Sequence, residues 1–112
     1  MATLAAGQVI LVTFPFSDLS ETKLRPALVL ADAGRGDWIL CQITSNAFSD
    51  PNAVELTVGD FRMGSLHRVS YARPGKLFTG NRSLVSSHVG TLTQEALQDV
   101  LGALIRLLSS DV

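Results

Sequence analysis

Helical periodicity is confined to the C-terminal end of this 112-residue sequence. Apolar residues recur there at every third or fourth position, which predicts an amphipathic helix over residues 93–109. Thr93 is suited to cap the N-terminus of this helix, with Leu92 and Leu97 forming a hydrophobic staple around the cap. The earlier apolar segments lack this period, so most of the chain must be organised in another way.

The apolar segments before residue 93 have the length and composition of β-strands. Residues 8–14 are rich in β-branched side chains and are followed by Pro15, which predicts a strand buried largely on both sides. Residues 27–31 and 37–44 predict a second and a third strand, separated by turn residues 32–36. Shorter strands are expected over residues 53–58, 68–73 and 76–79, with Pro74 and Gly75 as a turn or bend between the last two.

Two polar segments separate these strands. Residues 17–23 predict an exposed loop, and residues 45–52 are rich in turn-forming residues and predict a second, mobile loop. Several short strands followed by one helix predict a mainly β (α+β) fold, namely a small, strongly bent antiparallel sheet or partly open barrel with the helix packed on it. At this length we expect a single domain over residues 1–112.

Composition removes several classes of protein. An apolar fraction of 46% with only 17% charged residues is that of a folded, core-rich chain and argues against intrinsic disorder. No apolar run approaches the roughly 20 residues that a membrane span needs, and the N-terminus lacks the pattern of a secretion signal. We therefore expect a soluble, cytoplasmic protein with no membrane partner.

The net charge of −1 neither favours nor excludes nucleic acid, but the charge is unevenly distributed. Residues 61–94 contain no Asp or Glu, although they hold more than half of the nine basic residues. These are Arg62, Arg68, Arg73, Lys76 and Arg82. They either form one positive face or point in separate directions as solvated side chains, and the sequence leaves both interpretations open.

Common catalytic and metal-binding motifs are missing. The chain has no phosphate-binding glycine loop, nucleophile elbow or His-Glu-x-x-His sequence. The lone Cys41 lies within an apolar run and is predicted to be part of the core, while His67 and His88 have no carboxylate close in sequence and are expected to be structural or solvated. We therefore expect no metal site and no cofactor.

Two residues at strand ends suit phosphate chemistry. Pro26 holds Arg25 in an extended conformation beside a polar loop, where a guanidinium fork can bind the oxygens of a phosphate. Period-two alternation places Thr44 on the same face as Trp38, Leu40 and Gln42, with its hydroxyl opening toward the loop side. From position alone, a solvated or loop-capping Arg25 and a Thr44 that bonds nearby backbone groups remain the simpler interpretations.

Taken together, six segments of the chain change this weighting. The chain resembles the MazF/PemK-like toxins over nearly its whole length, with the segments in the order and spacing of that family. They are residues 7–12, 14–18, 23–30, 42–45, 73–79 and 89–92. The resemblance implies an SH3-like barrel with small helices, a homodimer, and sequence-specific cleavage of single-stranded RNA, usually messenger RNA, that a cognate antitoxin blocks.

By the same resemblance, Arg25 and Thr44 are the catalytic pair. They would promote attack of the ribose 2′-hydroxyl on the adjacent phosphorus without a metal ion, giving a 2′,3′-cyclic phosphate. Phe16, Phe48 and Phe78 are candidates to stack on bases. The implied RNA-binding residues are Phe16, Ser17, Asp18, Ser20, Glu21, Lys23, Ser45, Asn46, Arg73, Lys76 and Thr79.

One departure and two alternatives remain. One branch of the family has an acidic residue five positions before the catalytic Arg, whereas this chain has Ser20 there and Glu21 one position later, so the proton-transfer partner stays open. The related CcdB-like toxins share the architecture but poison DNA gyrase by binding, without catalysis. A catalytically silent SH3-like interaction module is the third interpretation.

Overall fold

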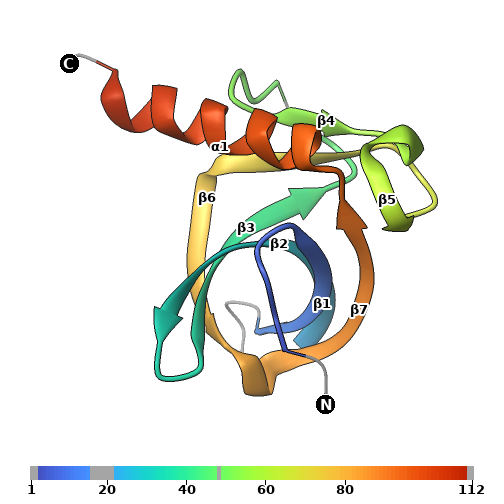
Figure 1. Ribbon diagram of the computed structural model, residues 1–112, viewed down its shortest axis with the longest axis vertical. Coiled ribbons are helices and arrows are strands. Elements are labelled where there is room, and N and C mark those ends of the chain that lie inside the picture. Colours follow the sequence, from blue (N-terminus) through green and yellow to red (C-terminus); the bar gives the residue numbers. More distant parts are fainter. Residues whose placement is uncertain (1–2, 16–21, 48, 111–112) are drawn as a thin grey trace.

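The computed structural model describes residues 3–15, 22–47 and 49–110, and Figure 1 shows the arrangement of its elements. The sheet consists of the strands β1 (Gln8–Pro15), β2 (Thr22–Gly34), β3 (Asp37–Thr44), β4 (Val54–Leu56), β5 (Phe61–Gly64), β6 (Ser70–Asn81) and β7 (Val85–Leu92). Two short 3₁₀ helices, η1 (Val58–Asp60) and η2 (Arg82–Leu84), and one α-helix, α1 (Gln94–Ser109), complete the described part of the chain.

The strands form one antiparallel sheet in the order β4-β6-β3-β2-β1-β7-β5. The sheet curls until its ribbon nearly closes into a ring, with α1 lying across one side of it (Figure 1). Helix α1 contacts β6, β4 and β7. The predicted mainly β fold with a strongly bent antiparallel sheet and a C-terminal helix is confirmed.

The two faces of the sheet carry two apolar clusters. The helix-side cluster contains Val9, Cys41 and Ile43 together with Val100 from α1. The second cluster lies on the other face and contains Ile10, Val12, Ala27, Val29 and Leu40. Neighbouring residues of β1 and of β3 therefore belong to different clusters, as period-two alternation predicts.

Cys41 is completely buried, which confirms its predicted place in the core. Burial in this apolar environment raises the pKa of its thiol to about 12. The predicted helix is also confirmed, since α1 spans Gln94–Ser109 and the Thr93 hydroxyl accepts a hydrogen bond of 3.1 Å from the backbone N–H of Ala96. No helix in the described ranges is long and apolar enough to cross a membrane.

The second strand is longer than predicted at both ends. Thr22 and Lys23, predicted in the first loop, pair with Pro15 and Phe14 of β1. At its other end β2 continues to Gly34, because shifts in its register with β3 keep Asp32 paired with Trp38. The turn between β2 and β3 is therefore shorter than the predicted residues 32–36 and consists of Arg35 and Gly36. Their φ angles of 58° and 83° lie in the left-handed region that tight hairpin turns require.

Pro74 and Gly75, predicted as a turn or bend, do not form a turn that ends the strand, because β6 continues from Ser70 to Asn81, but they do interrupt its ladder with β3. Gln42 of β3 pairs with Arg73, but the preceding Cys41 pairs with Leu77, so residues 74–76 form a bulge. Proline has no N–H to donate to a ladder, and a bulge accommodates it without ending the strand. Strands β5 and β7 were not predicted, since their apolar residues are too few to show alternation.

Candidate functional site

Arg25 and Thr44 lie on neighbouring strands, each just beyond the same end of the β2–β3 ladder. The β2–β3 ladder ends where Ala27 pairs with Gln42. Arg25 and Thr44 are the next residues on the same faces of β2 and β3, two positions farther along each strand. Both side chains therefore project from the same face of the sheet at this end of the ladder, although the residues are 19 positions apart in the sequence.

Each member of this pair is anchored by a strand on its other side. Arg25 pairs with Val12 of β1, and its side chain is exposed. Thr44 pairs with Tyr71 of β6, and its side chain is half-buried. The backbone that carries the exposed Arg25 guanidinium is thus held in place by its pairing with β1.

The hydroxyl of Thr44 is bonded within its own turn. It accepts a hydrogen bond of 3.2 Å from the backbone N–H of Asn46 and donates one of 3.1 Å to the carbonyl oxygen of the same residue. This is the local bonding that the simpler interpretation of Thr44 expected. A ligand oxygen that accepts from Thr44 must replace only the bond to the Asn46 carbonyl, which is solvent-exposed and inexpensive to give up.

A second row of polar side chains lies beside the first. Gln42 and Arg73 pair across β3 and β6, two residues from Thr44 and Tyr71, and therefore project from the same face. The Oε1 atom of Gln42 is buried and accepts no hydrogen bond. The residue that carries this acceptor oxygen, Gln42, is thus the direct cross-strand neighbour of Arg73.

Arg73 makes the one ion pair found among the described residues. Its Nε donates to Oδ2 of Asp50 over 2.8 Å, and both side chains are largely shielded from solvent. Asp50 lies in the segment between β3 and β4, 23 residues away. The hydrogen bond from Arg73, followed by the bond from the backbone N–H of Asn52, holds the pKa of Asp50 below its usual value, and the charge of Lys76 acts in the same direction.

The other predicted RNA-binding residues are placed in different ways. Lys23 is exposed on β2, on the same face as Arg25, and Ser45 and Asn46 are exposed directly after Thr44. Lys76 is exposed in the bulge of β6. Thr79 lies farther away, since it pairs with Ile39 near the other end of β6, where it lines a hollow that also includes Val12. The remaining predicted residues, Phe16, Ser17, Asp18, Ser20 and Glu21, lie outside the described residues, as does Phe48.

The acid-free stretch does not form one positive face. Arg62 lies on β5, next to the helix end of the molecule, whereas Arg82 lies in η2 at the opposite end (Figure 1). Arg73 is neutralised by Asp50 from another segment. The sequence left two interpretations open, and the one in which the basic side chains point in separate directions is correct.

Of the aromatic candidates, Phe78 packs against the second apolar cluster and is half-buried. It lines a hollow of about 230 Å³ together with Val12, Leu40 and Leu84. Since Val12 is the ladder partner of Arg25, this apolar hollow begins beside the candidate site.

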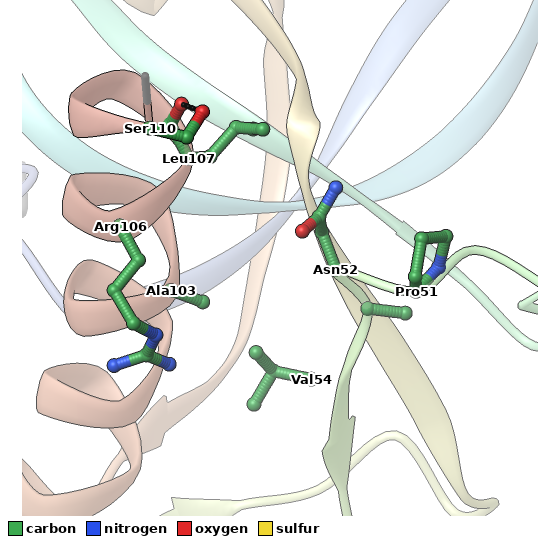
Figure 2. Close-up of a pocket in the computed structure, with 8 residues that line it drawn as sticks. Pro51, Asn52, Val54, Ala103, Arg106, Leu107 and Ser110 are labelled. Carbon is green, nitrogen blue, oxygen red and sulfur yellow. Dashed lines mark hydrogen bonds between the residues drawn. The ribbon is translucent and has the colours of Figure 1, made fainter. Parts of the chain in front are cut away.

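A second hollow, of about 280 Å³, lies on the other side of the molecule, between α1 and the segment that leads into β4. Figure 2 shows Arg106, Ala103 and Leu107 of α1 facing Asn52 and Val54 across it. None of the predicted site residues lines this hollow.

Sequence reasoning did not identify Asp50, Gln42 or Tyr71 as members of the site. Alternation along residues 71–73 was a usable signal for Tyr71, because it shares a face with Arg73. Asp50 had no such signal, since its partner is distant in sequence. Within the described ranges no three or more His, Cys, Asp or Glu residues are grouped to hold a metal ion. His67 is exposed, and Nε2 of His88 lies 3.1 Å from the hydroxyl of Thr91.

Residues 5–108 match the model of the PemK-like, MazF-like toxins of type II toxin-antitoxin systems. A search of curated proteins gives no match for this sequence.

Solved structures of toxins share the fold. The MazE-MazF complex (Form-II) from Deinococcus radiodurans aligns with a TM-score of 0.78 and 24% identity, over 99% of this chain and 100% of the other. MazF alone (Form-I) from the same organism gives a TM-score of 0.75 and 24% identity, over 98% and 100%. An endoribonuclease in complex with its cognate antitoxin, from Mycobacterial species, gives 0.73 and 17%, over 100% and 99%.

Proposed function

The chain belongs to the PemK-like, MazF-like toxins of type II toxin-antitoxin systems, and from this premise we propose that it is an endoribonuclease that cleaves single-stranded RNA. The observation that carries the proposal is the position of Arg25 and Thr44 on one face of neighbouring strands, each two residues beyond the last pair of the β2–β3 ladder. A permanently charged fork and a hydroxyl on one face of neighbouring strands suit a phosphate that gains negative charge during the reaction.

The proposed reaction uses the substrate's own nucleophile. The ribose 2′-hydroxyl attacks the adjacent phosphorus, the bond from phosphorus to the 5′-oxygen breaks, and the products carry a 2′,3′-cyclic phosphate and a 5′-hydroxyl. Arg25 donates to the non-bridging oxygens and Thr44 donates to the same phosphate through its hydroxyl, so both stabilise the transition state. The proton acceptor and donor are left unassigned, since Ser20 and Glu21 lie outside the described residues.

The remaining contacts fix the strand on both sides of the scissile phosphate. Lys23, Ser45, Asn46, Arg73 and Lys76 lie on or beside the strands that hold Arg25 and Thr44 and can bind neighbouring phosphates and sugars. The proposal also includes residues 16–18, 20 and 21 of the β1–β2 connection. Single-stranded RNA is preferred because its bases can be splayed out and read.

We further propose that the protein is a cytoplasmic homodimer that is held inactive by a cognate antitoxin. The support comes from the complexes with similar fold, in which MazF from Deinococcus radiodurans is bound to MazE and a mycobacterial endoribonuclease is bound to its antitoxin. Light scattering of the purified chain at micromolar concentration tests the dimer, for which twice the mass of 12.0 kDa is expected. A monomer at that concentration contradicts this part of the proposal.

The cleavage proposal is tested with purified protein and a long RNA, with and without excess EDTA. We expect cleavage in both samples, 5′-hydroxyl and cyclic or 3′-phosphate ends, and no cleavage where the 2′-hydroxyl at the cut site is replaced by hydrogen. Uncut RNA together with inhibition of DNA gyrase would support the CcdB-like alternative instead. Uncut RNA without an effect on gyrase or on growth would support a silent interaction module.

A further inference from the structure

Asp50 and Arg73 link the segment that follows Thr44 to the strand beside it. The Nε–Oδ2 distance is 2.8 Å, with the Arg73 and Asp50 side chains 21% and 11% exposed. Exposed ion pairs contribute little to stability, but a shielded, directional hydrogen bond fixes the geometry of both groups. The pair therefore defines where the Arg73 guanidinium stands.

The carboxylate of Asp50 is itself held in place. Its Oδ1 atom accepts a hydrogen bond of 2.9 Å from the backbone N–H of Asn52, so that each oxygen has one donor. The backbone N–H of Asp50 donates to the carbonyl of Ala47 over 2.9 Å. Ser49, directly before it, has a φ of 63°, a left-handed conformation that an L-residue adopts only at some cost. These contacts together fix the direction in which Oδ2 of Asp50 points.

The hydrogen bond to Asp50 involves only one part of the Arg73 guanidinium. It occupies Nε, which is one of the five N–H donors of the side chain, and the four donors on Nη1 and Nη2 take no part in it. Arg73 pairs with Gln42 on the face that carries Arg25 and Thr44. An arginine fixed at Nε by a carboxylate presents its two Nη groups as a fork that matches two phosphate oxygens.

We infer that Asp50 is a positioning residue for RNA binding: it orients the Arg73 guanidinium, which then binds a phosphate next to the one held by Arg25. This inference rests on the proposed function.

Charge alone predicts the opposite effect for loss of Asp50. Removing a carboxylate from a phosphate-binding face raises the local positive potential and would tighten RNA binding. Loss of positioning weakens RNA binding instead, since Arg73 then has to be ordered by the ligand. The sign of the change in affinity therefore separates the two effects.

The test uses fluorescence anisotropy to measure the Kd of a labelled single-stranded RNA with 2′-O-methylated riboses, which is not cut because it has no free 2′-hydroxyl. We expect Asp50→Ala and Arg73→Ala each to weaken binding by about tenfold, the scale of one charge-assisted hydrogen-bonding contact. The double variant should bind no more weakly than Arg73→Ala alone, because Asp50 acts through Arg73. Asp99→Ala on the exposed face of α1 is the matched control, and thermal unfolding checks that each variant is folded.

Three results overturn the inference. They are unchanged or tighter binding by Asp50→Ala, an Asp50→Ala effect of equal size when Arg73 is already alanine, and full affinity in Arg73→Lys, which keeps the charge but loses the fork. The second result would assign Asp50 to holding the loop alone. Failure of the proposed function gives a different pattern, in which the parent neither cuts RNA nor binds the uncut probe.

Discussion

Arg25 lies directly opposite Val12 in the β1–β2 ladder, which places an exposed guanidinium beside a side chain that is only 2% exposed. The backbone at position 25 is thus fixed by a strand whose inner residues belong to the core. Arg25 is itself exposed and is not a member of either apolar cluster. Function and stability are therefore separable at this position.

Arg25→Ala is expected to reduce RNA cleavage by about 10²-fold or more, because losing one donor to a transition-state oxyanion costs about 3–4 kcal/mol. The unfolding midpoint should stay within the range of ordinary surface substitutions. Turnover and circular dichroism are measured on the same preparation, with Arg62→Ala on β5 as the control. A folded Arg25→Ala protein with parental activity would remove Arg25 from the catalytic pair.

Thr44→Ala and Thr44→Ser separate the hydroxyl from the methyl group. The alanine variant loses the catalytic donor and the bonds to Asn46, so we expect about 10²-fold less cleavage and a loss of about 1 kcal/mol in stability. The serine variant keeps the hydroxyl and should keep most of the activity. Equal losses in the two variants would show that the methyl group, not the hydroxyl, matters at this position.

Much of the fold was predictable because its cause is local. Strand β3 was predicted with the observed bounds, since alternation along residues 37–44 reflects two buried faces. The N-terminus of α1 was predictable from Thr93, whose capping bond spans three residues. Strand β5 was missed, because its short sequence becomes a strand only through pairing with β7, a non-local contact.

The residues of the candidate site likewise fall into those that the sequence identified and those that only the fold brings together. Arg25 and Thr44 were identified by resemblance, but only the register shows that they lie on one face beyond the same end of the β2–β3 ladder. The Asp50–Arg73 pair crosses 23 residues, and no period or spacing in the sequence connects its members. For the same reason the acid-free stretch suggested a positive face that the fold does not form, since Asp50 reaches Arg73 from outside that stretch.

Gly90→Ala is expected to lower the free energy of unfolding by about 2 kcal/mol or more, as overpacking of a close contact does. A Cβ at this position would lie 2.7 Å from Cδ2 of Phe61 and 2.8 Å from the carbonyl oxygen of Met63. Gly59→Ala is the control, because its nearest neighbour would be Thr57 Oγ1 at 3.8 Å. Chemical denaturation measures both, and similar midpoints for the two variants would contradict the close packing of β5 on β7.

Cys41 is expected to resist thiol reagents at about pH 8 in the folded protein and to react on unfolding, because the thiolate is the reactive form. Burial raises its pKa from 9.0 to about 12. Below the pKa of the unfolded state, the thiol is neutral in both states and the free energy of unfolding is fully retained. As the pH rises from there toward 12, only the unfolded state ionises, so the free energy of unfolding decreases. Reaction of the native protein at the rate of a free thiol would contradict the burial of Cys41.

The pH dependence of stability tests the Asp50–Arg73 pair independently of RNA. The hydrogen bond from Arg73 lowers the pKa of Asp50 below its ordinary value of 3.8 in the folded state. A carboxyl group with a lowered folded pKa stabilises the protein above its unfolded value, and this contribution disappears as the pH falls through the folded value. The parent should therefore lose more of its Tm between about pH 5 and pH 2 than Asp50→Asn does, because the amide does not titrate in this range. Asp99→Asn controls for the removal of a carboxyl group as such. Parallel Tm curves for the parent and Asp50→Asn across this range would show that Arg73 does not stabilise the charged form of Asp50.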